Sequence, residues 1–202
     1  MSAEKLLQAV EEGNVALVKQ LCEEGKADIN ATDSNGEGVL IKACMSESYQ
    51  SRQCIDILLY HGVDTAVVGE DGWTPLHYCA RIGGGLVVKL VEHGAKVNAL
   101  TDTGDSALHV ASEYGHIICV QVLIENGCNV NATNTHGQTS LHKAASQNHV
   151  AIVAQLLQAG AIKDIQDSSK KTPLALAKSK GYRDSATILK KFSSVKSQAA
   201  VS

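Results

Sequence analysis

One short pattern returns along this chain at a nearly constant interval. GWTPLHYCA begins at Gly72, GDSALHVAS at Gly104 and GQTSLHKAA at Gly137, while KKTPLALAK from Lys170 keeps the pattern without its Gly and His. The four copies share a leucine, and consecutive leucines are 32, 33 and 33 residues apart: Leu76, Leu108, Leu141 and Leu174. Self-similarity at such a period indicates a repeat architecture, in which each unit packs mainly on its neighbours.

Each copy is followed by a second apolar stretch that ends in glycine, such as LVVKLVEHG, and CIDILLYHG and LVKQLCEEG have the same form upstream. The sequence therefore predicts six repeats in one domain, residues 1–192, with approximate bounds 1–31, 32–67, 68–100, 101–133, 134–166 and 167–192. The last ten residues, SSVKSQAAVS (193–202), have no apolar pattern, and we expect them to be disordered.

The residues of one repeat predict two helices. Thr74 can cap the free backbone N–H groups of a first helix, and Pro75 suits the first helical position because it needs no N–H partner there. A second helix ends at Gly94, which can adopt the left-handed conformation. Its apolar face consists of Val87, Leu90 and Val91. Neither helix can bury its apolar face alone, so stacking on neighbouring repeats is required.

About 190 residues of the chain resemble the ankyrin-repeat family. The resemblance rests on four features that occur together: T-P-L-H, a period near 33, G-A after the second helix and a closing V-N-A. The resemblance implies an all-α curved solenoid, with short first helices on the concave side, second helices on the convex side and loops projecting as hairpin fingers. It also implies that His77, His109 and His142 bond to helix-capping hydroxyls and loop backbone, which is a structural role.

Composition and charge argue against several function classes. The net charge is −3, whereas nucleic-acid or membrane binding favours a clear basic excess. The sequence contains no run of about 18 apolar residues, so we expect no membrane span. The start, SAEKLLQAVEEGN, predicts an amphipathic helix rather than a signal peptide. The charge is uneven, because residues 1–101 carry 14 acids and 8 bases, and residues 102–202 carry 7 acids and 10 bases.

The six cysteines form no C-x-x-C pair and have no histidine spacing suited to zinc, so we expect no metal site. They are typical of reduced, buried residues in an intracellular protein. We therefore expect the protein to be cytoplasmic or, in the alternative, nuclear as well. We also expect it to be a monomer by itself. The stretch RIGGGLVVK (81–89) lacks the spacing of a phosphate-binding loop and predicts a tight turn between two helices. We therefore expect no cofactor.

Catalysis by the recurring histidine would require three equivalent sites, each with its own nucleophile or carboxylate. The repeats also leave no separate block of sequence for an active site. We therefore expect no enzyme activity and no catalytic residue, but a protein-binding module that acts as an adaptor, inhibitor or assembly factor.

Two departures from the repeat keep alternatives open. The second repeat has extra residues within MSESYQSRQ (45–53), which predict a longer first helix or loop, or else an edge of the binding surface or a phosphorylation site. The sixth repeat is rich in lysine and arginine, which predicts a solvated cap, or else a contact with an acidic partner or nucleic acid.

The resemblance implies that a partner contacts the finger tips and the exposed ends of the first helices. Transferred to this sequence, the predicted protein-binding residues are Glu37, Glu70, Asp71, Trp73, Arg81, Ile82, Asp102, Asp105, Glu113, Tyr114, Gln138, Ser146 and Gln147. Other residues at these positions are Ser34, Asn35, Met45, Thr103, Thr135, His136 and Lys171.

Trp73 is the most informative of these residues, because its counterparts in the other repeats are Glu37, Asp105, Gln138 and Lys171. The fold therefore does not require an aromatic side chain there. An exposed tryptophan near acids predicts an anchor for a partner segment with an apolar group and lysine or arginine. The alternative is that Trp73 packs against its own hairpin.

Overall fold

The computed structural model describes residues 2–46 and 48–192, and the predicted disordered tail lies outside this range. Twelve α-helices form six consecutive pairs over the described residues. They are α1 (Ser2–Glu11) and α2 (Val15–Glu23), α3 (Val39–Met45) and α4 (Tyr49–Tyr60), α5 (Pro75–Ile82) and α6 (Leu86–Glu92), α7 (Ala107–Tyr114) and α8 (Ile117–Glu125), α9 (Ser140–Ser146) and α10 (Val150–Gln158), and α11 (Pro173–Ser179) and α12 (Arg183–Lys191). The predicted all-α repeat fold is confirmed.

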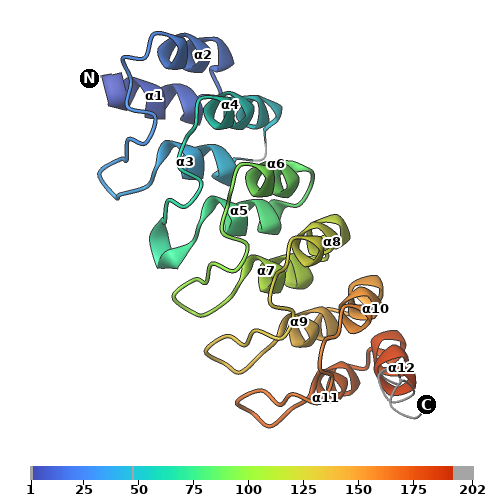
Figure 1. Ribbon diagram of the computed structural model, residues 1–202. Coiled ribbons are helices and arrows are strands. Elements are labelled where there is room, and N and C mark those ends of the chain that lie inside the picture. The colour runs from blue at the N-terminus through green and yellow to red at the C-terminus, as the bar shows by residue number, and fades with distance from the viewer. Residues whose placement is uncertain (1, 47, 193–202) are drawn as a thin grey trace, which may run out of the picture. The chain divides into compact units, whose positions relative to one another are not determined.

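The chain divides into two compact parts, residues 1–103 and 104–202, here called the N-terminal and C-terminal halves. In the N-terminal half, α1, α3 and α5 lie in one row and α2 and α4 pack beside one another in a second (Figure 1). In the C-terminal half, α7, α9 and α11 form the first row, and α8, α10 and α12 form the second. Within each half, the loops before the first helices project from the first row as fingers.

The core of each half is made by aliphatic side chains that recur with the repeat. Leu76 in the N-terminal half and Leu108 and Leu141 in the C-terminal half are buried, and each contributes roughly 1.5–3 kcal/mol through its removal from water. Leu174, the fourth leucine of the pattern, is only half-buried. The last repeat therefore buries less of its first helix than the repeats before it.

The helix starts follow from the predicted caps. The side chain of Thr74 accepts a hydrogen bond from the backbone of the third helical residue, His77, and Pro75 occupies the first helical turn. The Thr172 hydroxyl accepts from the Ala175 N–H at 3.2 Å in the sixth repeat. In the third repeat, the second helix is followed by Gly94 with φ of 84°, as the sequence predicts.

Two constraints favour glycine at the finger turns of the fourth and fifth repeats. Gly137 has φ of +67°, and a Cβ atom there would lie 3.1 Å from the Ser168 backbone nitrogen of the next finger. Gly104 is similarly close to the backbone of Asn134. Lys170, which replaces the glycine in the sixth repeat, also has a positive φ, of 60°. It therefore carries the conformational strain that glycine avoids elsewhere.

The extra residues of the second repeat lie in its second helix. The first helix, α3, has 7 residues and ends at Met45, whereas α4 has 12 residues. The other second helices have 7 or 9 residues. The predicted lengthening of the first helix is therefore wrong, because Ser48 caps a new helix start through the Ser51 N–H, 3.0 Å away.

The glycine-rich stretch forms a turn, as predicted. Helix α5 ends at Ile82 and α6 begins at Leu86, and Gly83 and Gly84 both have positive φ. Among the described residues, we found no helix with the length and apolar character needed to cross a bilayer.

Candidate functional site

The histidines of the fourth and fifth repeats connect the start of each first helix to the finger of the next repeat. In the fourth repeat, the buried His109 accepts a hydrogen bond at Nδ1 from the Ser106 backbone N–H, 3.1 Å away. Its Nε2 therefore carries the proton and donates to the Gln138 carbonyl of the next finger, 2.9 Å away. His142 makes the same contacts, with the Thr139 N–H at 3.1 Å and the Lys171 carbonyl at 3.1 Å.

Burial determines the charge state of these two rings. Desolvation lowers the pKa of His109 and of His142 below the ordinary value, so each is neutral near pH 7. Both nitrogens of each ring already make hydrogen bonds within the fold, which leaves neither ring a free base for proton transfer. His77 is held alike at Nδ1, 3.2 Å from the Thr74 backbone nitrogen and 2.8 Å from its hydroxyl oxygen.

Lys42 in the second repeat is surrounded by carboxylates. Its Nζ lies 2.7 Å from Glu37, 2.8 Å from Asp33 and 3.5 Å from Glu11. Hydrogen bonds to Asp33 and then Glu37 raise the pKa of Lys42, and the bond from Lys42 lowers the pKa of Asp33. The sequence predicts Glu37 as an exposed finger residue, but the residue is buried at 8% exposure because it pairs with Lys42.

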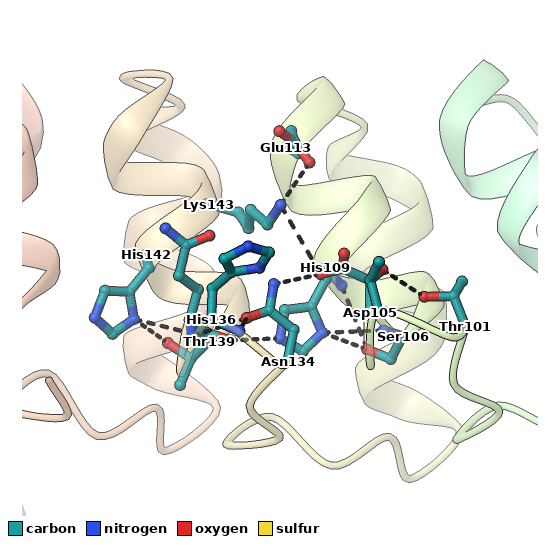
Figure 2. Close-up of polar contacts among 12 residues, drawn as sticks. Thr101, Asp105, Ser106, His109, Glu113, Asn134, His136, Thr139, His142 and Lys143 are labelled. Atoms are coloured by element: carbon teal, nitrogen blue, oxygen red, sulfur yellow. Dashed lines mark hydrogen bonds and ion pairs between the residues drawn. The ribbon is translucent and has the colours of Figure 1, made fainter. Parts of the chain in front are cut away.

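Lys143 occupies the same repeat position in the C-terminal half. It lies 3.0 Å from Glu113 and 3.9 Å from Asp105, and the Asn134 amide donates to Asp105 at 2.9 Å. Figure 2 shows the lysine between the two carboxylates. Glu113 and Asp105, both predicted to contact a partner, are therefore already engaged inside the fold and present less negative charge than free carboxylates would.

Trp73 packs on its own helix. Its ring centroid lies 5.1 Å from that of Tyr78 and 5.9 Å from that of His77. The Arg81 guanidinium lies 5.4 Å from the Trp73 ring centroid and 5.6 Å from that of Tyr78. Trp73 precedes the helix cap and Tyr78 is the fourth helical residue, which is the spacing of a hydrophobic staple.

Trp73 is therefore half-buried rather than fully exposed, and a cation of the same chain already lies over its ring. Trp73 thus packs within its own repeat, on α5 rather than against its own hairpin as the alternative supposed. The sequence contained a signal for this packing, because Tyr78 lies five positions after Trp73 across a helix start, and that spacing predicts contact between two apolar side chains.

Three predicted acids remain available in the N-terminal half. Glu70, Asp71 and Asp102 are exposed, and the Asp102 N–H donates to the Asp71 carbonyl at 2.9 Å, which links two successive fingers. Arg81 and Ile82 are half-buried at the other end of α5. The remaining predicted residues belong to the C-terminal half, where Tyr114 and Gln147 are exposed and Gln138 and Ser146 are half-buried.

A groove of about 250 Å³ lies in the N-terminal half beside these linked fingers. Its lining includes Val68, Leu100, Lys96 and Asp102. Val68 is 55% exposed and Leu100 is 53% exposed. Their counterparts four residues before the other finger turns are polar: Thr32, Thr133 and Gln166. The repeat comparison contained this signal, but sequence reasoning that began at the turn glycines missed it.

The cysteines and histidines do not form a metal centre in the part of the chain that the structure describes, since no group of three or more potential ligands gathers there. The Sγ atoms of Cys44 and Cys79 lie 3.5 Å apart in the core. The contact with Cys79 and burial raise the pKa of the Cys44 thiol, which makes it a poor nucleophile.

Comparison with known proteins agrees with this architecture. A family model described as "Ankyrin repeats (3 copies)" matches residues 6–101, 49–134, 76–167 and 108–199. A putative E3 ubiquitin-protein ligase XBAT34 of Arabidopsis thaliana is 34% identical over 121 residues, which are 59% of this chain and 32% of that protein. The SMC5-SMC6 complex localization factor protein 1 of Homo sapiens is 31% identical over 120 residues, 57% of this chain and 11% of that protein.

The Ankyrin repeat protein nuc-2 of Neurospora crassa is 28% identical over 117 residues, again 57% of this chain and 11% of the relative. This chain thus covers a third or less of the length of these relatives. Repeats of this type generally mediate protein–protein interaction. Because the overlapping matches of the family model span nearly the whole sequence, the chain belongs to the ankyrin-repeat family.

Proposed function

We propose that this chain is a non-catalytic protein-binding module, and that its main partner contacts the finger of the third repeat and residues 96–102 in the N-terminal half. The observation that carries this proposal is the groove between Val68 and Leu100, which has exposed apolar walls at positions that are polar in the other repeats. Exposed apolar surface rimmed by charge is characteristic of interaction sites.

The chemistry of the site favours one kind of partner segment. An aliphatic or aromatic side chain fits between Val68 and Leu100, and lysine or arginine beside it would face the exposed carboxylates of Glu70, Asp71 and Asp102. Carboxylates at the rim speed association and select for basic partners more than they add to affinity. The partner is therefore expected to present a short segment with one apolar group flanked by basic residues.

Trp73 lies between Gly72 and Thr74, which both line the groove. Its contacts with Tyr78 and Arg81 hold the finger of the third repeat against α5. Its exposed edge can still contact a partner, but a smaller share of the binding energy is expected to come from it than from a free aromatic anchor.

The relatives support a binding role without defining it. The names of two of them describe a ubiquitin ligase and a localization factor for a complex, and each aligns with this chain over only part of its own length. We infer that this chain supplies recognition as an adaptor, inhibitor or assembly factor, and that it acts in the cytoplasm.

The decisive variant is Leu100→Asp, which places a charge in the groove. Affinity purification with the wild-type chain identifies the partner, and calorimetric titration then measures its Kd for each variant. Leu100→Asp is expected to weaken binding at least about tenfold, or 1.4 kcal/mol, and Trp73→Ala several-fold. The matched control is Thr133→Asp, the same repeat position in the C-terminal half.

Circular dichroism and thermal unfolding establish that each variant keeps its fold. If folded Leu100→Asp bound the partner as tightly as the wild-type chain, the groove would not be the binding site. Equal losses in Leu100→Asp and Thr133→Asp would also contradict the proposal, because the effect would then not be specific to the N-terminal half.

The basic sixth repeat carries a second candidate, contact with nucleic acid. Seven basic side chains are exposed there: Lys170, Lys171, Lys178, Lys180, Arg183, Lys190 and Lys191. A gel shift with duplex DNA and with single-stranded RNA at about 150 mM salt tests it, since phosphate contacts weaken steeply with salt. Absence of a shift at that salt concentration would dismiss this candidate.

A further inference from the structure

The C-terminal half has a continuous surface at the ends of its helix pairs away from the fingers. We call it the turn rim and define it as residues 114–118, 147–151 and 178–184. The His149 Nε2 lies 3.0 Å from the Glu113 carbonyl, and the Lys180 Nζ donates to the Ser146 carbonyl at 2.7 Å. These bonds join each turn to the helix end of the preceding repeat, so the three turns are neighbours on one edge.

One end of the turn rim is apolar. Tyr114 is 53% exposed, Ile117 is 43% exposed and Ile118 is 59% exposed. The corresponding residues of the fifth repeat are Gln147, Val150 and Ala151, and those of the sixth are Lys180, Arg183 and Asp184. The repeat fold therefore accepts small, polar or charged side chains at these positions, and three large apolar ones are not needed for packing.

The other end of the turn rim is basic. Lys178, Lys180 and Arg183 are all exposed, and Asp184 is the acidic side chain beside them. The hydrogen bond from Lys180 to a carbonyl leaves its positive charge in place. The turn rim is thus apolar in the fourth repeat and basic in the sixth, and the weakly polar fifth repeat lies between them.

We propose that the turn rim is a second docking surface, which binds an extended partner segment with apolar side chains at one end and carboxylates at the other. Packed helices are about 10 Å apart, so the two ends lie about 20 Å apart. An extended chain covers that distance in about six residues. The expected segment carries one or two large apolar residues and two or more acids at this spacing.

Charge and size argue for this occupant over others. The basic cluster complements carboxylates, whereas a surface that binds membranes places basic residues around its apolar ones instead of two repeats away. A stable dimer buries about 800 Å² per partner, more than three apolar side chains provide. The turn rim shares no residue with the groove at Leu100, so the failure of one proposal leaves the other standing.

Peptide display tests the proposal with the full chain. A library of random 12-residue peptides is selected against the wild-type chain, and enriched peptides are measured by fluorescence anisotropy on purified variants. We expect enriched peptides to pair aliphatic or aromatic residues with acids about six positions apart. Their Kd should rise at least tenfold for Ile118→Asp and for the Lys178→Glu, Arg183→Glu double variant.

Matched controls are Ala16→Asp, the position of Ile118 in the first repeat, and Lys26→Glu, an exposed lysine of the N-terminal half. Ile118→Ala adds a milder change, expected to raise the Kd about threefold, if the charge at Ile118→Asp perturbs the fold. Binding of the enriched apolar and acidic peptides that survives both sets of rim variants, or no enrichment of such peptides, would overturn the proposal.

Two further outcomes would also overturn it in favour of another occupant. Co-sedimentation with vesicles of anionic lipid that depends on Ile118 would indicate a membrane surface. Dimerisation that Ile118→Asp abolishes, measured by light scattering, would indicate a second copy of the chain.

Discussion

The second and fifth repeats hold their fingers and first helices together through different contacts. In the fifth, the finger is fastened by neutral groups, with Thr139 capping the helix and His142 bonded to it and to the next finger. In the second, Gly38 makes no side-chain cap and Ile41 stands at the histidine position. There, Lys42 binds two carboxylates of the finger and one of the preceding first helix.

This difference shows that the fold requires a fastened finger rather than a particular residue. The histidine bridge is buried, so its contribution to stability depends little on salt. It is lost when acid protonates the ring, because both ring nitrogens would then be donors. The lysine cluster is partly exposed to solvent, so it depends on salt and is indifferent to pH near neutrality. The fifth repeat uses Lys143 as well, but with fewer carboxylates than Lys42. Four predictions test the comparison.

The largest effect is expected for His109→Ala, which removes from the fourth repeat the bridge that His142 makes in the fifth. The substitution leaves the Gln138 carbonyl and the Ser106 hydroxyl without their ring partner, and we expect a loss of roughly 2 kcal/mol in the free energy of unfolding. Urea denaturation measures it. His136→Ala, at an exposed finger histidine, is the control and should cost little. A neutral His109→Ala would show that the bridge does not stabilise the fold.

Lys42→Met should cost about 1–2 kcal/mol, because three carboxylates then face one another without their cation. Lys143→Met should cost less, about 0.5–1 kcal/mol. Lys19→Met, at an exposed pair with Glu23 3.7 Å away, serves as the control. The same urea titration ranks the three variants, and the reverse order for Lys42 and Lys143 would refute our account of the clusters.

Acid should produce a smaller loss, because only the protonation-dependent part of the histidine bridges is affected. The folded pKa values of His109 and His142 lie below the unfolded value of 6.5. The unfolded chain thus binds more protons, so stability is retained above pH 6.5 and falls as the pH decreases below it. Unfolding free energies between pH 7.5 and 5 should show a shallower slope in a His109→Gln, His142→Gln double variant. An unchanged slope would contradict the assignment.

The smallest effect concerns salt. Raising sodium chloride from about 0.1 to 1 M shortens the screening length from about 10 to 3 Å, which should reduce the cost of Lys42→Met by a few tenths of a kcal/mol. The cost of His109→Ala should stay the same, because that bridge is neutral and buried. Equal salt dependence in both variants would show that the two fastenings do not differ as we describe.

The sequence by itself determined the repeat fold and its local rules. The period of the leucines, the cap at Thr74 and the proline after it predict helix pairs because those signals act within a few residues of chain. The structural role of the histidines followed from the family resemblance. That acids gather at the finger tips was also predictable, since Glu70, Asp71 and Asp102 lie within two residues of the turn glycines of the repeat.

Tertiary structure alone decided which of these side chains is available to a partner. Glu37 and Trp73 occupy the same repeat position, yet one is buried by Lys42 and the other packs on Tyr78 and Arg81. The groove at Val68 and Leu100 likewise forms from residues about 30 positions apart. The exposure of a side chain depends on the side chains that contact it across a helix start or from the next repeat. A periodic sequence pattern specifies the backbone position of a residue, but it does not specify which side chains surround it.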